Sequence, residues 1–158
     1  MCRLYFFSLT RKVCSTDLQI VQGYKAEHDQ PGMILGHEFV GRVVQGGPIE
    51  IMGKRVVGTI SISKCKTPCE FCALFPKGNH CAKREVLGIL HHDGCFAEYM
   101  KLPITNLVLV PESIPAEMAV FTEPLAAAFR VVEQLEAKFL SHALAGPIAV
   151  IVRKIFGC

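Results

Sequence analysis

The sequence predicts a mainly β fold with short helices, in which a small distorted β-barrel carries a cysteine-rich lobe and is followed by helices. Three observations predict it. Short β-branched pieces punctuated by glycine run from Met33 to Ile62, four cysteines crowd into Cys65–Cys81, and an apolar period of three and four residues begins after Pro115. The chain has 158 residues, which fits one domain.

The chain begins with a tail and a helix. Met1–Lys12 shows no clear apolar period, so we expect it to lie outside the barrel and to leave the barrel with an exposed edge. Ser15, Thr16 and Asp17 are all favourable N-cap residues, and apolar positions follow them. A helix is therefore predicted to begin at these residues. The polar stretch Lys25–Gln30 predicts a loop.

Frequent glycine predicts that the barrel strands are short and tightly bent. The β-rich pieces are Phe39-Val40, Val43-Val44, Val56-Val57, Ile60, Cys95–Met100 and Leu107–Val110. Asp93-Gly94 predicts a turn, and His91-His92 is expected to be an exposed pair in it. The segment Ser63–Asn79 between the strands is predicted to lack regular structure.

Two helices are predicted on the C-terminal side of the strands. Apolar residues recur at helical spacing from Val120 to Leu135. Pro124 lies inside this run, and proline is favourable in the first turn of a helix but not in its interior. The expected helices are therefore Ala116–Phe121 and Pro124–Phe139.

Charge and hydropathy exclude several classes of protein. The formal net charge is +3, with no long run of Lys or Arg, so a nucleic-acid partner is not expected. The apolar stretch Ile148–Val152 is too short to cross a bilayer, and the N-terminus has no convincing secretory signal. Eight cysteines, half of them in one short segment, favour metal binding in a reducing compartment over a disulfide scaffold. We expect a cytoplasmic protein without a membrane partner.

The cysteine lobe, defined as residues 63–84, has the spacing of a metal site. Its candidate ligands are Cys65, Cys69, Cys72 and Cys81. Four thiolates in a short loop satisfy the tetrahedral preference of zinc, and few large apolar residues are present to order the loop otherwise. The alternatives are buried free cysteines, one accidental disulfide, or a nucleic-acid-binding zinc ribbon. His80 competes with Cys81 as the fourth ligand, and Cys81 is preferred because the other three ligands are sulfur.

A second segment, Gly36-His37-Glu38-Phe39-Val40-Gly41, is a weak signal alone. A lone histidine on a strand is more often a hydrogen-bonded structural residue than a ligand. It gains weight from the motifs that accompany it in order. These are Cys14-Ser-Thr-Asp17, Gly53-Lys-Arg-Val-Val-Gly58, the four-cysteine lobe, Asp93-Gly-Cys-Phe-Ala-Glu-Tyr99 and Thr122-Glu-Pro-Leu-Ala-Ala127.

Together, these motifs resemble the GroES-like catalytic domain of zinc-dependent medium-chain dehydrogenases, in particular the threonine and sorbitol dehydrogenases. The resemblance covers about Val13 to Leu135. It implies a GroES-like barrel with its zinc lobe over residues 13–139, and tails outside the family at residues 1–12 and 140–158.

The resemblance implies a catalytic zinc site as well as the structural one. By position, Cys14 and His37 match ligands of the catalytic zinc. Glu38 matches the acidic residue beside that histidine, which ligates zinc in some members. Glu123 matches a further ligand, or a water-bridged carboxylate, in members that act on polyols.

Two further positions match residues that support the chemistry. Thr16 matches the hydroxyl that relays the substrate proton, and Asp17 matches the carboxylate that orients the zinc-bound histidine. These roles agree with general chemistry. A catalytic zinc keeps three protein ligands and one open position, lowers the pKa of a bound hydroxyl, and needs its histidine held in one tautomer.

Each of these residues has a simpler structural interpretation. Cys14 can be a small buried hydrophobic residue, and Glu38 a salt-bridge partner. Thr16 and Asp17 can act as helix caps, which does not exclude the catalytic role. Glu123 can be an acidic residue favoured by the helix dipole in a first turn. Cys95 is expected to have no ligand role.

The sequence also departs from the family. The cysteine spacings x3, x2 and x8 replace the usual x2, x2 and x7. The C-terminal residues contain no G-x-G-x-x-G turn, so the NAD(P)-binding Rossmann domain that the family uses is expected to be absent.

The resemblance implies the catalytic portion of an NAD(P)-linked alcohol or polyol dehydrogenase with a small alcohol substrate. The alternative is a non-enzymatic zinc protein, which forms homo-oligomers or pairs with a full-length relative.

Overall fold

The computed structural model describes residues 3–23, 32–65, 69–74 and 79–139. Its strands are β1 (Arg3–Lys12), β2 (Glu38–Gln45), β3 (Arg55–Gly58), β4 (Ser61–Ile62), β5 (Glu85–Leu87), β6 (His91–His92), β7 (Tyr99–Pro103) and β8 (Leu107–Leu109). Its α-helices are α1 (Ser15–Val21), α2 (Glu70–Leu74), α3 (Ala116–Ala119) and α4 (Thr122–Phe139). Two 3-10 turns occupy Ile49–Ile51 and Ile104–Asn106.

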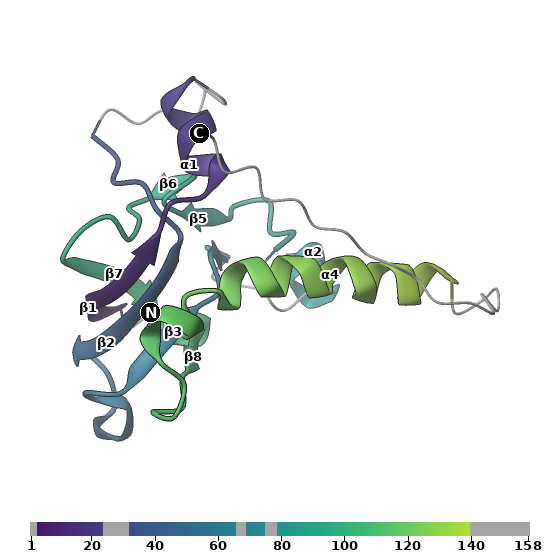
Figure 1. Ribbon diagram of the computed structural model, residues 1–158. Helices are drawn as coiled ribbons and strands as arrows, with labels where there is room; N and C mark the ends of the chain where they lie inside the picture. Colours follow the sequence, from purple (N-terminus) through teal and green to yellow (C-terminus); the bar gives the residue numbers. More distant parts are fainter. Residues whose placement is uncertain (1–2, 24–31, 66–68, 75–78, 140–158) are drawn as a thin grey trace.

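The strands form two sheets, which confirms the prediction of a mainly β fold (Figure 1). The larger is antiparallel, in the order β7-β1-β2-β3-β8, and the smaller has the order β4-β5-β6. Within the described residues the only parallel pairing joins β5 to β6 over two residue pairs. That part of the chain therefore contains no doubly wound parallel sheet.

The expectation that the N-terminal segment lies outside the barrel is wrong for residues 3–12. Arg3–Lys12 form β1, the longest strand in the described part of the chain, which pairs with β2 along one side and with β7 along the other. It therefore lies inside the larger sheet, whose edges are β7 and β8. Buried and exposed side chains alternate along β1, but polar and apolar side chains do not. Phe6 and the polar Ser8 are buried, whereas the apolar Phe7 and Leu9 are exposed. An apolar outer face hides the strand period from the sequence.

The core lies on both faces of the larger sheet. Alternate residues of β2 divide between two clusters, with Phe39 and Val43 in the main cluster and Val40 in the other. Val40 packs with Val57, Ala119 and Val120, so the second cluster joins the sheet to α3. This burial on two faces explains the nearly continuous apolar sequence of these short strands.

The remaining elements partly follow the predictions. The two C-terminal helices are confirmed, although α4 begins at Thr122 and holds Pro124 in its first turn. The cysteine lobe is not devoid of structure, because it contains α2. The strand expected at Cys95–Met100 begins only at Tyr99. His91-His92 form β6 rather than a turn, with His91 exposed. None of the helices in the described ranges is both long and apolar enough to cross a membrane.

Candidate metal centres

Three predicted ligands from separate places in the fold meet in one group. A ligand atom of Cys14, one of His37 and one of Glu38 all lie within 4.8 Å of one another. Cys14 precedes α1, whereas His37 immediately precedes β2 and Glu38 is its first residue. His37 is 3% exposed and Glu38 is fully buried, while Cys14 is half-buried. The group therefore has a buried side and, at Cys14, a more open one.

Gly36 fixes the entry of the chain into this group. Its φ is +96°, in the left-handed region, and a Cβ built there would lie 2.5 Å from the Phe96 ring and 2.8 Å from Cys95 Sγ. Only glycine satisfies both the backbone conformation and the close packing. Gly36 therefore lets the chain place the His37 imidazole in this group. The G-H-E motif alone does not show why a glycine is needed at that position.

Asp17 is the hub of the group. Its Oδ2 accepts a hydrogen bond of 2.7 Å from the Cys14 N–H, and its Oδ1 accepts one of 3.2 Å from the Gly36 N–H. Oδ1 also lies 3.3 Å from His37 Nδ1. The helix begins at Ser15, as predicted, but its N-cap is Cys14, and Asp17 is the third helical residue. One buried carboxylate thus caps α1 and contacts both candidate ligand segments.

The environment of His37 favours a charged ring when no metal competes. Burial lowers the pKa of His37, but the hydrogen bond to Asp17 and the negative charge of Asp17 outweigh this effect. Cys14 and Glu123 add smaller contributions, and together these groups raise the pKa of His37 to about 9. Contact of Nδ1 with Asp17 leaves Nε2 as the ring nitrogen for a ligand. Two buried carboxyl groups, Asp17 and Glu38, also make the site suited to a cation.

Thr16 lies beside the three clustered ligands, whereas Glu123 lies outside their group. The Cys14 Sγ lies 3.7 Å from the Thr16 Oγ1, so this hydroxyl borders the group. Glu123 is not among the three clustered ligands. Its charge nevertheless contributes to the raised pKa of His37, and its side chain lines a separate cleft between the larger sheet and α4.

The four candidate ligands of the cysteine lobe also converge. The Sγ atoms of Cys65, Cys69, Cys72 and Cys81 all lie within 4.8 Å of one another. Tetrahedral zinc with Zn–S bonds of ~2.3 Å requires sulfurs about 3.8 Å apart, so this arrangement fits the metal. Each of the six cysteines in the described ranges is a free thiol. His80 is exposed and lies outside the group, whereas Cys81 is buried within it.

Neighbouring cysteines of the lobe have pKa values shifted in opposite directions. The Ser63 Oγ lies 3.6 Å from Cys81 Sγ, and this hydrogen bond is the main cause that lowers the pKa of Cys81 to about 6. Cys65 Sγ lies 3.3 Å from Cys81 Sγ, and hydrogen bonding to Cys81 raises the pKa of Cys65 to about 12. Cys81 is therefore the more readily deprotonated sulfur of this pair, and the thiolate is the form in which cysteine binds a metal.

Some contributors were not expected from the sequence. Ser63 also lies 3.3 Å from Cys72 Sγ, so one hydroxyl contacts two of the four sulfurs. Its position two residues before Cys65 was the only available signal. Cys95, for which no ligand role was predicted, is fully buried with its Sγ 3.6 Å from the Glu38 carbonyl oxygen, and it is absent from both groups.

The chain is similar to known proteins over most of its described length. A family model for the alcohol dehydrogenase GroES-like domain matches residues 10–112. An L-threonine 3-dehydrogenase from Xanthomonas euvesicatoria is 36% identical over 115 residues, which cover 71% of this chain and 33% of that protein. The chain thus spans about a third of the length of this curated relative.

Solved structures share the fold. A zinc-binding dehydrogenase from Sinorhizobium meliloti, bound to NADP, superposes with a TM-score of 0.72 at 30% identity, over 84% of this chain and 38% of that one. Glucose dehydrogenase from Haloferax mediterranei, in complex with NADP, zinc and gluconolactone, gives a TM-score of 0.73 at 25% identity, over 89% of this chain and 40% of that one.

Proposed function

The chain belongs to the alcohol dehydrogenase GroES-like domain family, and on this premise we propose that it is the metal-carrying catalytic portion of a zinc-dependent, NAD(P)-linked alcohol or polyol dehydrogenase. The reaction is the reversible oxidation of a small alcohol, preferably secondary, to a ketone or aldehyde. The observation that carries the proposal is the convergence of Cys14, His37 and Glu38 within 4.8 Å. The names of the threonine and glucose dehydrogenase relatives support the same substrate class.

The donor set fits a catalytic zinc. One thiolate, one imidazole and one carboxylate are the ligand types that such sites use, and three protein ligands leave a fourth position for substrate. A zinc ion bound there would act as a Lewis acid that lowers the pKa of a coordinated hydroxyl.

The surrounding residues then have defined tasks. Thr16, beside Cys14 Sγ, accepts the proton that the substrate hydroxyl gives up and passes it toward solvent. Asp17, 3.3 Å from His37 Nδ1, keeps the ring in the tautomer with Nε2 as ligand. Glu123 contributes its charge near His37 from the first turn of α4 and is assigned to the same site as an alternative ligand.

We assign the substrate to the cleft beside α4. This cleft has a volume of about 660 Å³, and its lining includes Gly58, Thr59, Glu123 and Phe129. Glu123 connects the cleft electrostatically to His37. A mostly apolar cleft next to a polar group is typical of sites for small molecules.

The hydride acceptor in this proposal is NAD(P). The described residues contain no strand, glycine-rich turn and helix of the kind that binds a dinucleotide. We therefore assign the cofactor to a domain or chain other than the described one. Titration of the purified 158-residue chain with NADH should show no tight binding.

The direct test is the zinc content of the purified chain, measured by elemental analysis for the wild type and for Cys14→Ser. We expect two zinc ions per wild-type chain and loss of one in Cys14→Ser. Cys69→Ser is the matched variant, and it should lose the other zinc. An unchanged zinc content in Cys14→Ser would remove this residue from any metal site and overturn the assignment.

A second candidate function is a non-enzymatic zinc protein that pairs with a full-length relative. It is favoured by exposed apolar side chains on the edge strand and on α4. Val108 and Leu109 of β8 are 51% and 56% exposed, and Leu125 and Phe129 of α4 are 55% and 60% exposed. Dehydrogenase activity that changes only on mixing with such a relative, together with co-sedimentation of the two chains, would favour this function.

A further inference from the structure

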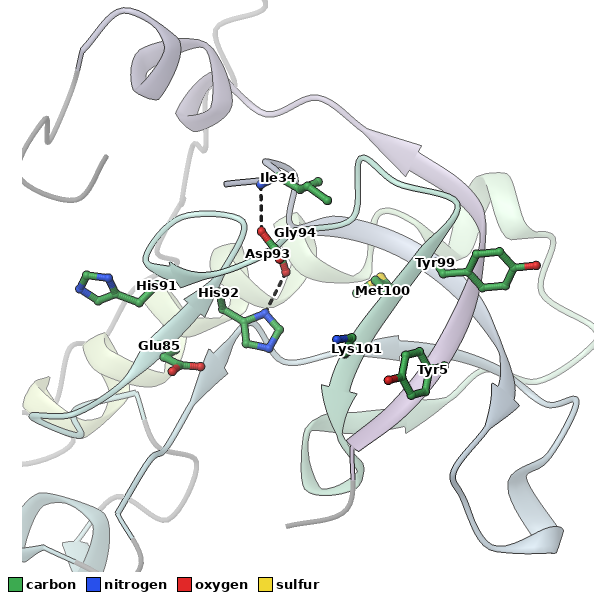
Figure 2. A pocket seen from close by; sticks show the side chains of 10 residues that line it. All are labelled: Tyr5, Ile34, Glu85, His91, His92, Asp93, Gly94, Tyr99, Met100 and Lys101. Carbon is green, nitrogen blue, oxygen red and sulfur yellow. Dashed lines mark hydrogen bonds between the residues drawn. The ribbon is translucent and has the colours of Figure 1, made fainter. Parts of the chain in front are cut away.

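A second pocket lies where the outer face of β1 and β7 meets β5 and β6 (Figure 2). Its volume is about 310 Å³, which suffices for a small metabolite. None of the candidate metal ligands lines it. We propose that this pocket binds a small zwitterion with an ammonium and a carboxylate group, such as a free α-amino acid, between Glu85 and His92 on one wall and Lys101 on the other.

His92 is held in one orientation by the loop that follows it. Its Nδ1 lies 2.8 Å from the Asp93 carbonyl oxygen, and because a carbonyl only accepts, Nδ1 carries the hydrogen. The Nε2 lone pair is then an acceptor, and Figure 2 shows the ring between Glu85 and Lys101, while His91 points away. The Asp93 carboxylate is turned toward Ile34 and accepts a hydrogen bond of 3.1 Å from the Ile34 N–H.

The backbone around His92 is also constrained. The Gly88 N–H donates to the His92 carbonyl oxygen at 2.8 Å, and the Gly94 N–H donates to the Ile34 carbonyl oxygen at 2.7 Å. His91 has a φ of 54°, in the left-handed region that side chains other than glycine seldom adopt. Such a conformation persists only where its surroundings impose it, so His92 is preorganised rather than free to rotate with a loose turn.

The two ends of the pocket carry opposite charge. Glu85 provides a carboxylate at one end, and its Oε1 also lies 2.6 Å from Lys64 Nζ. Lys101 provides an ammonium at the other, 5.5 Å from the centre of the Tyr5 ring. Across the described ranges, Lys101 forms no ion pair with an acidic side chain within 4.0 Å.

A zwitterion satisfies both ends at once. Its ammonium donates to the Glu85 carboxylate and to His92 Nε2, and its carboxylate accepts from Lys101. An apolar body of the ligand contacts the Tyr5 ring and Ile34, which also line the pocket. A simple anion can pair only with Lys101, and a simple amine only with Glu85 and His92, so either one makes fewer charged contacts than a zwitterion does.

The test uses the zinc-loaded 158-residue chain and three probes with the same carbon body, namely L-leucine, isoamylamine and 4-methylpentanoate. Isothermal titration calorimetry should show saturable binding of L-leucine, with both single-charge probes about tenfold weaker or more. Lys101→Gln and Glu85→Gln should each weaken L-leucine by a similar factor. The exposed residues Lys54 and Glu50 provide the matched controls Lys54→Gln and Glu50→Gln, which should bind L-leucine as the wild type does.

Two further measurements distinguish binding in this pocket from binding at the metal group. His37→Asn should leave L-leucine binding unchanged, because His37 does not line the pocket. If L-leucine instead chelated zinc at His37, this variant would bind it more weakly. The ring signals of His92, assigned with His92→Asn, should shift on addition of L-leucine to wild type and not in Lys101→Gln. Equal affinity for all three probes, or L-leucine binding that survives Lys101→Gln but not His37→Asn, would overturn the proposal.

Discussion

Replacement of Asp17 by asparagine tests how one buried carboxylate holds the candidate catalytic site together. Asp17 is 2% exposed and accepts from the Cys14 and Gly36 N–H groups while it lies 3.3 Å from His37 Nδ1. Asparagine has one acceptor oxygen, so its NH₂ group must face either the Cys14 N–H or the Gly36 N–H and His37. Loss of one charged hydrogen bond in a buried setting costs about 2 kcal/mol of stability.

The same substitution should weaken zinc at this site. With an amide donor against Nδ1, His37 no longer needs to present Nε2 as the ligand nitrogen. We expect an affinity for the catalytic zinc 10–100-fold lower, roughly as for other residues that orient a ligand. Competition with a chromogenic chelator measures it, while the zinc of the cysteine lobe serves as an internal reference.

The pH dependence separates charge from hydrogen bonding. Burial lowers the pKa of His37, but Asp17 overrides burial and raises it from 6.5 to about 9. In the metal-free protein this pair therefore contributes stability that is fully present below pH 6.5 and is lost as the pH rises through about 9. At ~1.36 kcal/mol per pH unit, the shift corresponds to about 3 kcal/mol. Asp17→Asn should cost most near pH 6 and least above pH 9.

Guanidinium unfolding of the chelator-treated proteins at several pH values is the assay. Asp93→Asn is the matched control, because Asp93 also accepts a backbone N–H, from Ile34 at 3.1 Å, but has no contact with His37. The control should lose less stability and show no such pH dependence. If Asp17→Asn loses stability by the same amount at pH 6 and pH 10, and keeps its zinc affinity, then Asp17 does not orient His37.

Three other substitutions or modifications probe the lobe and the core. Cys72→Ser should lose one zinc per chain and make the cysteine lobe more sensitive to limited proteolysis, since four sulfurs share that site, whereas Cys95→Ser should keep its zinc. Asn106→Ala should lower the free energy of unfolding by about 2 kcal/mol, because the buried Asn106 amide donates hydrogen bonds of 2.8–2.9 Å to Thr59 and Ser61. Denaturant unfolding measures this loss, and an unchanged midpoint would contradict it. Burial raises the pKa of Cys95 to about 12, so mass spectrometry should find this thiol unmodified by iodoacetamide at pH 8 in the native protein. Modification as fast as in the guanidinium-unfolded chain would argue against its burial.

Local spacing in the sequence was enough to predict the four-cysteine group, whereas Cys14, His37 and Glu38 were predicted together only from the resemblance to a family. Ligand preference is a property of side-chain type, and four cysteines within a short segment need no knowledge of distant contacts to be recognised as a possible site. The positions of α3 and α4 were also predictable, because helical periodicity and Pro124 are local signals.

The assembly of the strands and the sites became apparent only in three dimensions. β1 was missed because its outward residues Phe7 and Leu9 are as apolar as its buried ones, so the alternation that marks a strand is absent. The joint role of Asp17 and the pocket at Lys101 depend on segments far apart in the chain. Strand pairing brings such segments together: β1 pairs with β2 and with β7, which lie far from it in the sequence, so local patterns do not show which strands will be neighbours.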